Sequence, residues 1–253
     1  NNYLNHASAT PEIMLSALFL AILLFYFQLS ISTPLHAVSY KNTLHTWRVR
    51  NSRLDARAAS ECDLKNVHVT TNDSSPLPPP SEDLVAKHIA IGRGTQNYNC
   101  TKDPADLPIP IGALALLYDA SCIASDDPTT LSQLSNAALK LRLPTDETNT
   151  FTSFDLAVSG HHFFPDPKTP VFDFSTAAAD LGSVIPKKNS SVPPPPDSIA
   201  GQNNKGDGAV SWLKLVASSG KLREVYRVNT AGGNPPKTCR GMPATFSVQY
   251  SAE

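Results

Sequence analysis

The chain has 253 residues, of which 22 are proline and 12 are glycine, and only 17% are charged. This composition favours short elements joined by many turns over long helices. The formal net charge is −1 and no cluster of basic residues interleaves with aromatic ones, which excludes nucleic acid as an expected partner.

An uncharged apolar run near the start of the sequence predicts export. The run MLSALFLAILLFYFQLSIS occupies residues 14–32. Its apolar part has the length of a signal-peptide core, and Ser30 and Ser32 supply the small residues of a cleavage site. Basic residues follow the run, which is instead the pattern of a retained membrane anchor. We expect residues 1–32 to be removed, with a membrane contact only if the run is retained.

The next segment has the composition of a flexible leader. Residues 33–83 mix basic and polar residues with the proline-rich run SSPLPPPSED and show little hydrophobic periodicity. The folded domain is therefore predicted over residues 84–253.

Apolar runs of strand length recur through this domain, separated by Gly, Pro, Asn and Asp. In the last run, Phe246, Val248 and Tyr250 alternate with polar residues, as the two faces of a half-buried strand require. The runs are 84–91, 95–100, 111–118, 154–164, 170–174, 209–217, 224–230 and 245–250. They predict an all-β, single-domain antiparallel sandwich or barrel with long loops.

One segment, DDPTTLSQLSNAALKLRLP, predicts a short helix. Its apolar residues at roughly helical spacing are Leu131, Leu134, Ala138 and Leu141. Thr129 or Thr130 is the expected N-cap. The proline-rich and glycine-rich residues 185–208 predict an exposed loop, because prolines and clustered glycines do not sustain a strand ladder.

The stretch HIAIGRGTQNYNC resembles the start of a dinucleotide-binding loop. That loop needs a third glycine, a helix behind it and an acidic residue about twenty positions further on. Here Asn97 takes the third glycine position, and two prolines follow instead of a helix. We expect no nucleotide cofactor, and we predict that Gly92 and Gly94 form a turn or bulge between two strands.

The sequence SGHHFFPD contains the candidate metal ligands His161 and His162. Adjacent residues of a strand point to opposite faces, so one ion would contact both rings only if the strand bent there. His88 is a candidate third ligand, although nothing in the sequence places it nearby. The favoured interpretation is one packed and one exposed histidine, without a bound metal.

Nucleophilic catalysis has little support in the sequence. Ser121 and Ser159 lack the flanking glycines of a nucleophile elbow. The cysteines are expected to pair with each other, and a cysteine in a disulfide is not a thiolate nucleophile. No catalytic residue is therefore predicted.

Cysteine number and sequons fit an exported protein. Cys62, Cys100, Cys122 and Cys239 form an even set that allows two disulfides in any of three pairings. Their spacing does not fit a structural zinc site. Sequons at Asn72, Asn99 and Asn189 predict N-glycosylation. Asn99 is followed by Cys100, which is a candidate to block glycosylation at that site.

The stretch RVNTAGGNPPKTC is the most distinctive in the chain. Its glycine and proline pairs predict a tight, rigid connection that Cys239 pins to the body of the fold. A structural clasp is favoured here over a binding loop.

Together with GRGTQNYNC, LYDASC, GHHFF, TPVFDF, AVSWLKL and FSVQYSAE, this stretch makes residues 77–253 resemble the DUF3455 family. The resemblance implies one β-rich domain, an exported protein of a kind common in fungi, and no established reaction. It also implies a disulfide between Cys100 and Cys239, leaving Cys62 to pair with Cys122. Some fungal members carry the label malate dehydrogenase, which the missing nucleotide fingerprint argues against.

These observations predict an extracellular or cell-surface protein that binds or has a structural role. Cell-wall glycan is the candidate partner, and no cofactor is expected. The alternative is a secreted enzyme, metal-dependent through His161 or His162.

Overall fold

A computed structural model describes residues 62–71, 75–144, 150–151, 155–177 and 180–253. The apolar run at 14–32 lies outside these residues, so the predicted signal peptide or anchor stays a prediction. Within the described ranges, no helix is both long and apolar enough to cross a bilayer.

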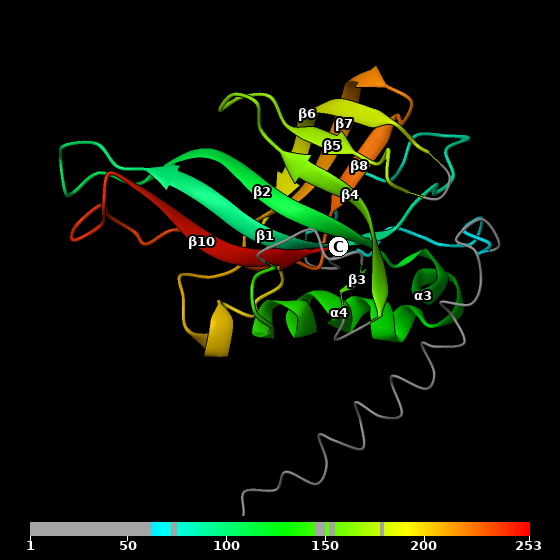
Figure 1. Cartoon of the computed structure of the whole chain (residues 1–253), viewed down its shortest axis with the longest axis horizontal. Helices are drawn as coiled ribbons and strands as arrows, with labels where there is room; N and C mark the ends of the chain where they lie inside the picture. Colours follow the sequence, from blue (N-terminus) through cyan, green and yellow to red (C-terminus); the bar gives the residue numbers. More distant parts are fainter. Residues whose placement is uncertain (1–61, 72–74, 145–149, 152–154, 178–179) are drawn as a thin grey trace, which may run out of the picture. The chain divides into compact units, whose positions relative to one another are not determined.

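The described residues form one antiparallel sheet with two α-helices packed on it (Figure 1). The strands on its main path are β1 (Ala90–Asn99), β2 (Ile109–Asp119), β4 (Leu156–Phe163), β5 (Val171–Asp173), β6 (Ser183–Val192), β7 (Trp212–Gly220), β8 (Glu224–Arg227), β9 (Ala231–Gly232) and β10 (Thr245–Ala252). Their order is β8-β7-β6-β5-β4-β2-β1-β10-β9, and β3 (Thr150–Phe151) pairs with β4. The all-β antiparallel prediction is confirmed. Because the end strands β8 and β9 do not pair with each other, the sheet is not closed into a barrel.

The two faces of the central strands have different neighbours. Helices α3 (Ser121–Asp126) and α4 (Pro128–Lys140) lie below β10, β1 and β2 in Figure 1. Ile91 and Tyr118 point to this helix side and pack with Leu131 and Leu134. On the opposite, inner face, buried small residues such as Ala115 pack with Tyr250. The predicted alternation of β10 is confirmed, since Phe246 and Tyr250 share the inner face with their partners in β1.

The predicted turn at Gly92 and Gly94 is wrong, because both glycines lie inside the ten-residue strand β1. A Cβ atom on Gly94 would lie 1.9 Å from the carbonyl oxygen of Leu114 in β2. This glycine therefore permits a close approach of two strands and supplies no turn geometry.

The helix predicted from DDPTTLSQLSNAALKLRLP is confirmed as α4, but its predicted N-cap is two or three residues late. Asp127 is the cap, and its carboxylate accepts a hydrogen bond from the backbone N–H of Thr130 at 3.1 Å. Pro128 occupies the first helical position, where its missing N–H costs nothing. The structure also contains α3, which was not predicted, and a 3-10 turn at Gln202–Asn204.

The exposed loop predicted over 185–208 is wrong in its first part, which belongs to β6. Two register shifts, at Ile185/Pro186 and Lys188/Ser190, let this strand follow β7 despite its proline. Polar residues and bulges hide such a strand from a search for alternating apolar residues.

Part of the predicted leader packs on the folded domain. Leu64 and Leu77 are buried in two apolar clusters. The hydroxyl of Ser81 donates to the Glu224 carboxylate at 2.6 Å, and Lys214 donates to the carbonyl of Pro79 at 2.6 Å. The packed residues therefore begin upstream of Leu84.

The RVNTAGG stretch crosses from one edge of the sheet to the other. Val228, just after β8, exchanges both backbone hydrogen bonds with Glu253, just after β10. Gly232 and Gly233 have φ angles of 64° and 97°, which favour glycine. A Cβ on Gly233 would lie 2.9 Å from side-chain atoms of both Tyr250 and Val210. These contacts are those of a structural clasp.

Arg93 holds α4 against the sheet. Its side chain is 1% exposed and projects from β1 toward the end of the helix. Nε donates to the carbonyl of Ala138 at 3.1 Å, and Nη2 donates to that of Leu141 at 2.9 Å. The same guanidinium also bonds Tyr250 O at 3.2 Å and the side-chain oxygen of Gln249. The last carbonyls of a helix lack hydrogen-bond donors within it, and the negative end of the helix dipole favours a nearby cation. Arg93 supplies both the donors and the positive charge.

Replacing Arg93 with methionine should lower the free energy of unfolding by about 3 kcal/mol or more, because buried carbonyl groups lose their donors. Urea denaturation of R93M against wild type measures the change. The control is K140M, which removes an exposed cation from the same helix end and should change stability by less than about 0.5 kcal/mol. Equal stability of R93M and wild type would contradict the assignment.

Gly94→Ala should prevent β1 from pairing with β2 and cost more than about 4 kcal/mol. Gly92→Ala is the matched control in the same strand. Its Cβ would meet the flexible end of Leu117 at 3.3 Å and the carbonyl oxygen of Ala252 at an ordinary contact distance of 3.7 Å, so we expect a loss of about 1 kcal/mol or less. Circular dichroism and thermal unfolding distinguish the two variants. A folded G94A protein with wild-type stability would show that the strands do not approach this closely.

Candidate functional site

His161 and His162 lie on opposite faces of β4. His162 is 6% exposed, and its ring stacks on Phe172 with centroids 4.0 Å apart. Its Nδ1 donates to the carbonyl of Val171 at 2.8 Å. His161 is half-buried and pairs in register with Asp173 of β5. The structure does not bring the two histidines together as ligands, and the described ranges hold no group of three candidate metal ligands.

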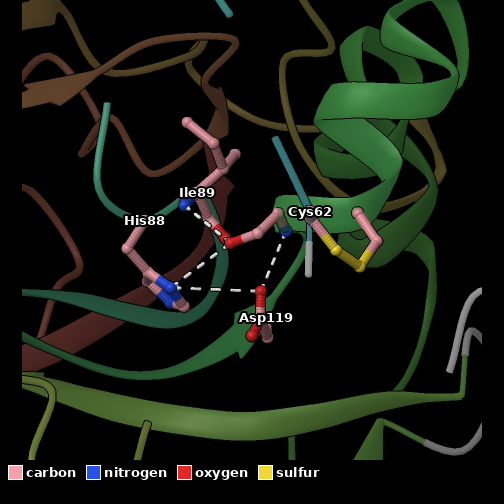
Figure 2. Close-up of a disulfide and its surroundings, with 6 residues drawn as sticks. Cys62, His88, Ile89 and Asp119 are labelled. Carbon is pink, nitrogen blue, oxygen red and sulfur yellow. Dashed lines mark hydrogen bonds and ion pairs between the residues drawn. A yellow bond between two sulfur atoms is a disulfide. The ribbon is translucent and has the colours of Figure 1, made fainter. Parts of the chain in front are cut away.

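His88 instead joins the two serines considered as nucleophiles in the sequence. Figure 2 shows its ring facing Asp119. Its Nε2 lies 2.8 Å from the Ser159 hydroxyl, and its Nδ1 lies 3.3 Å from that of Ser121. Asp119 accepts a bond from the backbone N–H of Ser121 at 2.8 Å, and its carboxylate lies 3.9 Å from Nδ1. Sequence patterns could not show this cluster, because His88 is 71 residues from Ser159.

The His88 cluster has some parts of a serine nucleophile but not its accessibility. Ser159 is 2% exposed, and its hydroxyl also lies 3.3 Å from the carbonyl of Leu117. The Asp119 carboxylate is too far from His88 for a direct hydrogen bond. Burial lowers the pKa of His88, and the nearby Asp119 opposes this only in part. His88 is therefore a buried, neutral residue at the place where three parts of the fold meet: the segment that precedes β1, the strand β2 and the strand β4.

Both disulfides implied by the family resemblance are present. Cys62 and Cys122 have Cα atoms 5.1 Å apart, and their disulfide lies beside the His88 cluster in Figure 2. It attaches the segment around Leu64 to α3. Cys100 and Cys239, with Cα atoms 5.6 Å apart, connect the end of β1 to the chain beyond the glycine clasp.

A second polar group, here called the inner cluster, lies on the inner face of the sheet. It consists of Arg227 from β8, Gln96 and Tyr98 from β1, His162 from β4 and Tyr250 from β10. Burial raises the pKa of Tyr98 to about 12 and lowers that of His162 to about 4. Both groups are therefore neutral at pH 7, while burial lowers the pKa of the Arg227 guanidinium.

A third feature is an uncharged surface on the outer part of β1, β2 and β10, here called the outer strip. Asn97 lies at its centre and accepts hydrogen bonds from the hydroxyls of Thr95 at 3.0 Å and Ser247 at 2.8 Å. Two exposed aliphatic side chains lie beside them, Leu114 at 59% and Ile109 at 50% exposure. By strand register, the strip consists of Thr95, Asn97, Asn99, Ile109, Leu114, Thr245 and Ser247.

The predicted glycosylation sites have different positions. Asn99 and Asn189 are exposed, whereas Asn72 lies outside the described residues. Asn99 is part of the outer strip, at the end of β1. Exposure permits a glycan at both described positions, and its presence stays a prediction.

Comparison with known proteins gives a family but no activity. A family model described as a protein of unknown function, DUF3455, matches residues 80–253. No curated protein matches the chain. No solved structure matches it either.

The buried histidines predict loss of stability in acid. In the unfolded chain histidine titrates near pH 6.5, whereas in the folded protein His162 titrates near pH 4. Between these pH values the unfolded chain binds a proton that the folded protein does not. The free energy of unfolding therefore falls as the pH drops from 6.5 toward 4. His162 alone should contribute about 3 kcal/mol of this loss at pH 4, and His88 acts in the same direction.

Urea unfolding of wild type and His162→Phe at several pH values measures this effect. Phenylalanine keeps a ring beside Phe172 but cannot be protonated, so its stability should depend less on pH. His68→Asn, at an exposed position, is the control that retains both buried imidazoles. Identical slopes for wild type and H162F between pH 6.5 and 4 would rule out burial of a neutral His162.

Proposed function

Because the chain belongs to the DUF3455 family, whose description assigns no function, we propose that it is an exported protein that binds neutral cell-wall glycan at the cell surface. The outer strip is the observation that carries this proposal. It combines hydrogen-bonding side chains with exposed aliphatic groups and contains no charged residue.

Export is supported by the covalent structure. Two disulfides join the described cysteines, and none of the four is free. Such bonds persist in oxidising compartments and are rare in the cytosol. The uncharged apolar run at 14–32 and the exposed sequon residues Asn99 and Asn189 agree with this location.

Binding of a neutral glycan is supported by the chemistry of the outer strip. Sugar hydroxyls exchange hydrogen bonds with amide and hydroxyl side chains, which Asn97 and Ser247 provide. The Asn97 oxygen already accepts from Thr95 and Ser247, so its amide N–H groups remain as the donors for a sugar hydroxyl. Leu114 offers an apolar contact for the C–H face of a sugar ring. Three paired strands fix these positions before binding, which lowers the entropy lost on association.

A secreted hydrolase is the second candidate, favoured by the 2.8 Å contact between Ser159 and His88. It requires the buried Ser159 to become accessible to substrate. The metal-dependent alternative needs ligands beyond His161 and His162, and among the described residues no third ligand joins them. The outer strip requires no rearrangement, so binding is the preferred function.

A cell-wall pull-down tests the proposal with purified chain and insoluble polysaccharide in buffers of high and low salt. Asn97→Ala and Leu114→Ser should each weaken binding by about fivefold or more, because both change contact residues. Val216→Ser is the control, since it changes an exposed aliphatic residue on β7, away from the strip. Salt should have little effect, as no charge pairs form.

Asn99 needs its own variant, because a glycan attached there would occupy part of the outer strip. Intact mass of wild type and Asn99→Gln shows whether one is present, and both proteins enter the pull-down. Failure of both to bind any neutral polysaccharide, or equal binding by wild type and the N97A and L114S variants, would contradict the proposed function.

A further inference from the structure

The inner cluster contains a cation without an anionic partner. The electrostatic partners of Arg227 are the phenols of Tyr98 and Tyr250, both of which are neutral because burial raises their pKa values. Among the described residues, no carboxylate forms an ion pair with Arg227. The carboxyl group of Glu253 instead accepts a hydrogen bond from Asn229 at 2.7 Å. A half-buried charge of this kind is costly unless something pairs with it.

The cluster also has unused hydrogen-bond donors. Arg227 Nε and Nη2 both donate to one acceptor, the carbonyl of Ser211, at 3.3 and 2.8 Å. Gln96 is 9% exposed, and its Nε2 has no partner of normal hydrogen-bond geometry, although it approaches Tyr250. Arg93 differs, because all three of its guanidinium nitrogens donate to protein oxygens.

Apolar side chains adjoin these donors. The ring of His162 stacks on Phe172 and contacts Phe164 edge-on at 5.3 Å. Phe164 also packs against the apolar cluster on the inner face that contains Ala113, Ala115 and Tyr250. A ligand with one negative group and an apolar body would therefore be complementary to these side chains. Among the described side chains, Arg227 has no neighbouring free cation in the cluster that could pair with another negative charge on the ligand.

We propose that the inner cluster binds a small monocarboxylate, with Arg227 holding the carboxylate group and Gln96 Nε2 donating a further hydrogen bond. The planar guanidinium suits a carboxylate better than a spherical anion, because two parallel N–H groups match its two oxygens. This site is on the opposite face of β1 from the outer strip, so it is independent of the proposed glycan binding.

Benzoate is the probe, tested on the purified full chain against sodium chloride at equal ionic strength. Benzoate should raise the melting temperature in a saturable manner, and chloride should not. Arg227→Gln should abolish the effect, and Gln96→Leu should weaken the affinity by about tenfold, because a buried donor to a charged group is lost. Arg223→Gln, an exposed arginine next to β8, is the control and should bind benzoate like wild type.

A second measurement needs no variant that might fail to fold. With ¹⁵N-labelled arginine, benzoate should shift the Nε–Hε signal of Arg227 and leave that of Arg93 unchanged. Absence of a saturable effect beyond that of chloride, unchanged benzoate binding in R227Q, or a wild-type spectrum without a shifted arginine signal would each overturn the proposal. Glycan binding would be unaffected by any of these results.

Discussion

Arg93, a buried arginine whose guanidinium donates to backbone carbonyls, joins the helix layer to the sheet. Arg93 is part of β1, the strand that pairs with both β2 and β10, and its guanidinium reaches the last carbonyls of α4. Burial lowers its pKa only to about 10, so it stays charged at neutral pH. The carbonyls at the end of α4 compensate the charge of Arg93. Helix α4 can therefore pack on the sheet only with its C-terminal end facing β1.

The rest of the structure is consistent with this constraint. Gly94 brings β2 close to β1 beside the arginine, and Gly233 brings the clasp close to β10. The two disulfides then attach the upstream segment and the chain beyond the clasp to this frame. The frame leaves two faces of β1 available for function: the inner cluster contains Gln96 and Tyr98, and the outer strip contains Thr95 and Asn97.

Patterns of neighbouring residues in the sequence predict those helices and strands that are determined by the spacing of their own apolar residues. Leu131, Leu134 and Ala138 have the spacing of α4, and Phe246, Val248 and Tyr250 have that of β10. Glycines that permit a close approach of strands look like turn residues, so β1 was predicted as two strands. Bulges and polar residues concealed β6. The inner and His88 clusters join distant strands, and no local signal marks such pairings.

The most direct test of the central claim is native-state hydrogen exchange on the wild-type protein. If Arg93 makes α4 and the central strands one cooperative unit, the slowest amides of α4 will exchange through the same opening, with the same free energy, as those of β1 between β2 and β10. Exchange of α4 through a separate opening of lower free energy, with β1 still protected, would contradict the claim.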